Sequence, residues 1–214
     1  MSTLMCAPRS CGSWSWDLED IFTPGLESAL KIAEKMVEVL RRFDLLTPTR
    51  LEYNWYTPGS GGIGVGSRLL LTEPLGDPNL PGRVLGSRPV AFEGARASHL
   101  RVVGTGAWAD AQGVFRKESR LVEVSVAPDS IGAWAELAVY HDIWSWFDFS
   151  GRPHPEVYNR NAPRLADALR EITSVLGVEP EPGEPTYFGH AVGFGISTPD
   201  ADDNGLGPDL TDHL

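Results

Sequence analysis

The chain has 214 residues, of which 42% are hydrophobic and 22% are charged, values typical of a globular protein and not of a disordered one. Its 29 acidic and 18 basic residues give a formal net charge of −11, which disfavours binding to nucleic acid or to an anionic membrane. The sequence has no apolar run near the ~20 residues of a membrane span and no signal peptide at its start, so we expect a cytoplasmic protein.

Residues 1–20 hold both cysteines, Cys6 and Cys11, among Pro, Ser and Gly, and we expect this N-terminal segment to be poorly ordered. Two cysteines with few nearby histidines do not complete a zinc site, so we interpret them as free thiols. No low-complexity linker divides the rest, which predicts a single α+β domain over residues 21–197.

The first predicted helix follows Pro24. Apolar residues recur at steps of three and four from Leu26 to Leu40, and charged residues fill the opposite face, which is the pattern of an amphipathic helix. Thr23 is the expected N-cap, and Thr47-Pro48 should end the helix.

Five segments rich in alternating, β-branched or aromatic residues predict strands: 50–56, 67–72, 98–108, 114–126 and 133–146. Turn residues between the third and fourth segments predict an antiparallel hairpin. The last segment has one apolar face and one mixed face, as in an antiparallel sheet that helices cover on one side only.

The remaining elements are a Pro/Gly-rich loop over 73–94, a helix over 161–176 that Gly177 ends, a short strand over 190–196 and an acidic disordered tail over 198–214. The sequence therefore predicts an α+β fold: an antiparallel sheet of about five or six strands, with an N-terminal helix and a later helix packed on one face.

Two motifs resemble ligand-binding loops only in part. Residues 59–64 have the glycine spacing of a dinucleotide-binding loop, but a strand follows where a helix is needed, so we predict a hairpin loop. Asp200, Asp202 and Asn204 match the first half of a calcium loop, whereas Thr211 stands where a bidentate Glu is required. The weak metal candidates are therefore these three residues, and we expect no metal and no cofactor.

The weak catalytic candidates are His141, Glu136, Tyr140 and Arg101, which lie on predicted strands and could line a cavity of the sheet. His141 and Asp142 are neighbours on one predicted strand, where their side chains point to opposite faces, so they do not form a catalytic pair. A small-molecule enzyme with its site in the sheet cavity is one alternative function.

Three tryptophans, Trp134, Trp144 and Trp146, fall on the mixed face of the last predicted strand. A helix can bury such a row, or the row can stay exposed as an aromatic platform for a protein or a sugar. A row that pairs with another subunit would make the protein a structural or assembly component, although the sequence does not specify an oligomeric state.

The strongest charge signal lies after Arg170, where nine acidic residues follow without a single Lys or Arg. Such a region favours a basic protein partner. In layout alone, the predicted fold resembles bacterial immunity proteins that neutralise toxins, which is a fold-level analogy without a motif. The sequence therefore favours a non-catalytic acidic protein-binding module, of an immunity-like or accessory kind, that engages a basic partner.

Overall fold

The computed structural model describes residues 4–128 and 133–214. Within these residues the main sheet has eight strands, seven of them in the order β3-β2-β4-β6-β7-β1-β8, and every neighbouring pair is antiparallel. The eighth strand, β5, pairs with the end of β4. The strands of this sheet are β1 (Gly12–Asp17), β2 (Thr47–Thr57), β3 (Gly61–Leu70), β4 (Arg96–Ala109), β5 (Phe115–Ser119), β6 (Val122–Val126), β7 (Trp134–Val139) and β8 (Glu181–Pro182).

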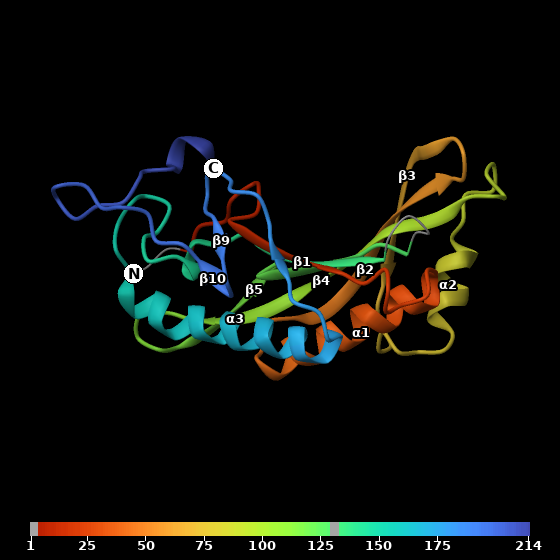
Figure 1. Ribbon diagram of the computed structural model, residues 1–214, viewed down its shortest axis with the longest axis horizontal. Helices are drawn as coiled ribbons and strands as arrows, with labels where there is room; N and C mark the ends of the chain where they lie inside the picture. The colour runs from red at the N-terminus through yellow and green to blue at the C-terminus, as the bar shows by residue number, and fades with distance from the viewer. Residues whose placement is uncertain (1–3, 129–132) are drawn as a thin grey trace.

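Two long helices, α1 (Leu26–Arg42) and α3 (Pro155–Leu176), contact each other and cover one face of the sheet (Figure 1). The smaller elements are the helix α2 (Leu80–Gly86), the 3-10 turns η1 (Asp142–Trp144) and η2 (Thr211–His213), and the short pair β9 (Ala191–Val192) and β10 (Gly195–Ile196). This arrangement confirms the α+β class and the antiparallel sheet. In the part of the chain that the structure describes, no helix has the length and apolar character needed to cross a membrane.

The core lies between the sheet and the two helices. Alternate residues of β2, β4, β6 and β7 point toward α1 and α3, because successive side chains of a strand face opposite sides. These buried positions include Leu51, Val102, Val124 and Leu137, and α1 contributes Met36 and Leu40. Among the described residues no helix covers the other face of the sheet, which carries the polar positions of the same strands.

The sheet has more strands than expected because the N-terminal segment takes part in it. β1 lies between β7 and β8, and its Trp14 and Trp16 are fully buried. The sequence analysis expects poor order for the N-terminal segment of residues 1–20, whereas residues 12–17 of this segment form β1 in the structure. Burial of the two tryptophans favours the strand, although serine and glycine lower its intrinsic propensity.

Other element boundaries also differ from the sequence prediction. The predicted strand over 114–126 is two strands, since Arg120 has a positive φ of 56° and turns the chain between them. The predicted strand over 133–146 ends at Val139, and η1 follows. The helix α1 begins after Gly25 and not after a Thr23 cap. Within the predicted loop over 73–94, the structure has the helix α2.

The acidic C-terminal segment, expected to be disordered, has defined contacts with the loop before α3. The backbone N–H of Gly207 donates to the carbonyl of Gly151, and the N–H of Leu210 donates to the carbonyl of Phe149, both at 2.8 Å. These bonds hold residues 207–210 against the loop before α3, and Figure 1 shows the C-terminus near the separate β9–β10 pair.

Candidate functional site

The helix-free face of the sheet carries a continuous row of polar side chains. Directly opposed residues of neighbouring strands point to the same face, so the register defines the row. From β3 to β8 the partners are Arg68, Glu52, Arg101, Ser125, Glu136, Ser15 and Glu181. One end of this row is rich in arginine, and the other end is acidic.

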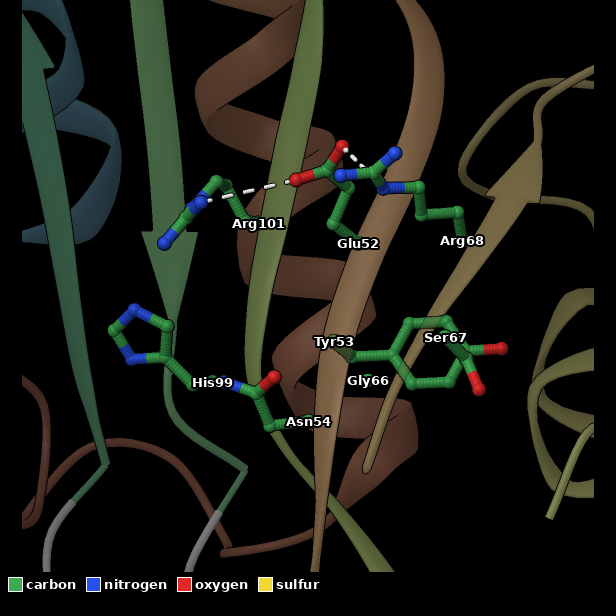
Figure 2. Close-up of a pocket in the computed structure, with 8 residues that line it drawn as sticks. All are labelled: Glu52, Tyr53, Asn54, Gly66, Ser67, Arg68, His99 and Arg101. Carbon is green, nitrogen blue, oxygen red and sulfur yellow. Dashed lines mark ion pairs between the residues drawn. The ribbon is translucent and has the colours of Figure 1, made fainter. Parts of the chain in front are cut away.

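At the arginine-rich end, three guanidinium groups surround the carboxylate of Glu52. Arg50 Nε donates a hydrogen bond to Glu52 Oε1 at 2.7 Å, and Arg68 Nε lies 3.4 Å from the same oxygen. Arg101 lies 3.7 Å from Glu52 Oε2. Figure 2 shows the Glu52 carboxylate between Arg101 and Arg68. Asn54 lies further along β2, and His99 lies further along β4.

A second carboxylate, Glu123 on β6, lies deeper on this face, and its side chain is only 6% exposed. It forms ion pairs with Arg101 Nε at 3.2 Å and with Arg120 Nε at 3.1 Å, and the Tyr140 hydroxyl donates to it at 3.2 Å. Burial and the neighbouring Glu123 charge raise the pKa of Tyr140 to about 12, so this phenol stays protonated. Arg101 is therefore held between two carboxylates.

The two carboxylates are outnumbered by four guanidinium groups, those of Arg50, Arg68, Arg101 and Arg120. The cluster has an excess of two positive charges in a protein whose net charge is −11. Arginine binds carboxylate and phosphate groups well because its planar fork donates two parallel hydrogen bonds.

A bulge in β4 places His99 at the edge of this cluster. Glu52 pairs with Arg101 and Asn54 pairs with Ser98, so two residues of β4 stand opposite the single residue Tyr53. His99 has a φ of 50°, a left-handed conformation that is unfavourable for a residue with a Cβ. Strained residues of this kind concentrate at functional sites.

The environment of His99 favours the neutral form of its imidazole. Burial, followed by the positive charge of Arg101, lowers the pKa of His99 below 6.5, and Glu136 and Glu123 oppose this effect. A neutral imidazole can donate one hydrogen bond and accept another, and it can take up a proton from a bound group.

These side chains line a cavity of about 480 Å³ between β2, β3 and β4. The polar side chains that line it on the open face are Glu52, Asn54, Arg68, His99 and Arg101 (Figure 2). Ser67 is the strand partner of the buried Tyr53 and shares its face, where the Ser67 hydroxyl accepts a hydrogen bond from Trp55 Nε1 at 2.8 Å. This size is in the range of small-molecule sites, although the polar lining suits a charged ligand more than an apolar one.

A second hollow, also of about 480 Å³, lies on the same face over β1, β7 and β8. Its charged lining residues are Asp17, Glu19, Glu136 and Glu181. None of these four carboxylates forms an ion pair with another described residue. Trp134 also lines this hollow, and its ring lies 5.5 Å from the His99 ring, so this aromatic pair lies between the two cavities.

Comparisons with protein-family models, with curated proteins and with solved structures found no match to this chain. The functional argument therefore rests on the geometry of this face.

The four weak catalytic candidates divide between the open face and the interior. Arg101 and Glu136 line the two cavities, and Tyr140 bonds to Glu123 below them. His141 is 2% exposed, and burial lowers its pKa to about 4. The structure thus brings three of the four to one face and places His141 elsewhere.

The three tryptophans do not form the shared face that the sequence predicted. Trp134 lies on the open face of β7, whereas Trp144 belongs to η1 and is fully buried. Trp146 packs edge-on against Tyr158 of α3 with ring centroids 5.7 Å apart. The alternation that would align them ends with β7 at Val139, and this correction leaves Trp134 alone as a candidate aromatic contact.

The weak metal candidates Asp200, Asp202 and Asn204 lie exposed in the C-terminal segment. Asp202 accepts hydrogen bonds from the backbone N–H groups of Asn204 and Leu206 at 2.9 and 2.8 Å, so its carboxylate organises a turn. Within the described residues no group of three or more His, Cys, Asp or Glu side chains is arranged to hold a metal ion.

Sequence reasoning missed Glu52, Arg68, Asn54 and His99. Glu52 and Asn54 alternate with buried residues of β2, and Arg68 lies on the partner strand β3. This pattern is also typical of ordinary solvent-facing positions. The two strand partners 52 and 101 carry opposite charges, a signal that would have needed the register. The positive-φ position of the β4 bulge is His99 and not a glycine, so the sequence does not indicate a bulge there.

Proposed function

We propose that this protein binds a small ligand through an anionic group, a carboxylate or a phosphate, in the cavity lined by Arg68, His99, Arg101 and Asn54. The observation that carries the proposal is the arginine cluster, which has four guanidinium groups to two carboxylates in an otherwise acidic chain and from which Arg68 and Arg101 line this cavity. Arg101 is fixed by Glu52 and Glu123, and Arg68 is 80% exposed at the rim, so one guanidinium is preorganised and the other is accessible.

The neighbours of the arginines suit the same ligand. Asn54 carries an amide that can donate a hydrogen bond, and the neutral His99 can donate another, so the ligand is held by four side chains from three strands. Binding is the role that these groups support. The free thiols Cys6 and Cys11 are typical of a protein in a reducing compartment, which favours binding in the cytoplasm.

The proposal is tested by titrating the protein with acetate and with inorganic phosphate while recording amide and arginine Nε NMR signals. Shifts confined to β2, β3 and β4, with millimolar affinity, are expected. Arg68→Gln should weaken binding about threefold to fivefold, as for an exposed charge contact. Arg160→Gln, which removes an exposed arginine from α3, should leave binding unchanged. Signals at β2–β4 that fail to move with either anion would refute the proposal.

A second candidate function is binding of a basic protein partner. Of the nine acids after Arg170, Glu171 pairs with Arg42, and the other eight are exposed and form no ion pair with a described residue. Opposite charge would then steer association and make affinity fall as salt rises. A partner recovered at low salt, lost at high salt and lost from a chain with Asp200, Asp202 and Asp203 changed to Asn would support this role. A partner retained by that variant would contradict it.

A further inference from the structure

The ligand of the arginine cavity can be specified further from the charge pattern of the whole face. The row that begins at Arg68 and Arg101 ends at Glu136 and Glu181, so the two cavities have opposite charge. A purely anionic ligand would use only one end and would be repelled by the other.

We infer that the ligand is a small, extended zwitterion, with its anionic group at Arg68 and Arg101 and its cationic group over Trp134 and beside Glu136. This inference rests on the proposed function, because it assumes that the arginine cavity holds the anionic group. It adds the second pole of the ligand and the residues that recognise it.

The cationic group has two partners of suitable chemistry. Trp134 is half-buried, with its ring against His99, and the face of an indole attracts ammonium and guanidinium groups. Glu136 lies next to Trp134 on the same face of β7 and lacks an ion pair among the described residues, so its carboxylate is available to a cation. Asp17, opposite Trp134 on β1, adds a second carboxylate.

The register sets the length of the ligand. Arg101 on β4 and Glu136 on β7 are separated by one strand, β6, where their common partner is Ser125. Two strand spacings place their backbones about 10 Å apart, so the two charges of the ligand should be separated by roughly 6–10 Å.

The overall charge of the protein agrees with a zwitterion. A net charge of −11 repels anions in solution and slows their approach to the arginine cavity. A ligand with a cationic end avoids this repulsion, and the acidic end of the face orients it.

The inference is tested with a series of ω-amino acids, from glycine through 4-aminobutanoic and 6-aminohexanoic acid to 8-aminooctanoic acid. Hexanoic acid and hexylamine serve as probes with only one charge. Affinity is measured by NMR titration, with the indole N–H of Trp134 as the local signal. We expect 6-aminohexanoic acid to bind about tenfold more tightly than either single-charge probe, and glycine to show no advantage over acetate.

The variants separate the two poles. Glu136→Gln should remove the advantage of 6-aminohexanoic acid over hexanoic acid and leave hexanoic acid binding unchanged. Glu38→Gln, an exposed position on α1, should change neither affinity. Arg68→Gln should weaken both ligands.

The outcomes also distinguish this inference from the proposed function. If hexanoic acid binds at β2–β4 and 6-aminohexanoic acid binds no better, or if Glu136→Gln has no effect, the zwitterion is excluded and anion binding stands. If neither hexanoic acid nor acetate shifts the β2–β4 signals, the proposed function itself is excluded.

Discussion

Replacing Asp142 with asparagine should stabilise the protein at neutral and alkaline pH. The side chain of Asp142 is almost completely buried in η1, where its Oδ1 accepts a hydrogen bond from the N–H of Met5 at 3.2 Å. Its Oδ2 is buried without a hydrogen-bond partner among the described residues. Burial, aided by the nearby Asp148 charge, raises the pKa of Asp142 from 3.8 to about 7.

The magnitude follows from linkage. A folded-state pKa above the unfolded value means that the carboxyl contributes stability below pH ~4 that is lost as the pH rises to about 7. The full loss is about 4 kcal/mol above pH ~7. An asparagine at this position would keep the Oδ1 acceptor and would not ionise, but it would bury an amide N–H₂ at a cost of about 1–2 kcal/mol. We therefore expect Asp142→Asn to gain about 2–3 kcal/mol near pH 8 and to lose about 1–2 kcal/mol near pH 4.

The assay is urea unfolding of both proteins at several pH values, and the quantity of interest is the difference between their free energies of unfolding. Taking this difference removes the contribution of His141 to stability, which also depends on pH. Burial lowers the pKa of His141 to about 4, so its contribution to the free energy of unfolding is lost as the pH falls from 6.5 toward 4. The two neighbours thus have opposite pH dependences in the same window. A difference that stays constant from acidic to alkaline pH would refute the assignment of a buried, neutral carboxyl to Asp142.

Three further substitutions test hydrogen bonding and packing within the fold. Glu123→Gln should lower the free energy of urea unfolding by about 2–3 kcal/mol, since it leaves two partly exposed guanidinium groups without their buried partner; a change below about 0.5 kcal/mol would contradict this. Asn161→Ala should cost about 2–4 kcal/mol in the same assay, because this fully buried amide makes two hydrogen bonds to the backbone of β4. Gly106→Ala should lower the melting temperature, because an added Cβ would overlap the carbonyl oxygen of Leu45, whereas Gly82→Ala, in open space on α2, should leave it unchanged or raise it; equal effects would show that the close approach at Gly106 is absent.

The sequence predicted the periodic elements well and the irregular ones poorly. The apolar spacing from Leu26 to Leu40 identified α1, and the turn residues Asp110–Gly113 identified the β4–β5 hairpin, because each signal is local. β1 was missed because its strand character depends on partners more than 100 residues away in β7. Local propensity does not contain that information.

The candidate site was predictable only in part for the same reason. Arg101 and Glu136 were recognised as charged residues on strands, but the residues that make them a site come from β2 and β3 and from a bulge. The tryptophan row failed because the strand was extended past Val139, where the chain turns into η1. The acidic end of the chain was visible from composition, whereas the local excess of arginine within it required the register.

The polar row draws each of its members from a different strand, between Ser15 near the start of the chain and Glu181 near its end. No fragment of the chain can therefore assemble the whole polar row, and a nascent chain completes it only after the segment beyond α3 has been synthesised. A ligand that spans the row would stabilise the complete sheet against unfolding, by an amount that grows with its concentration. Occupancy of the face would then protect the protein from proteolysis that begins at partly opened states, coupling the abundance of the protein to the supply of its ligand.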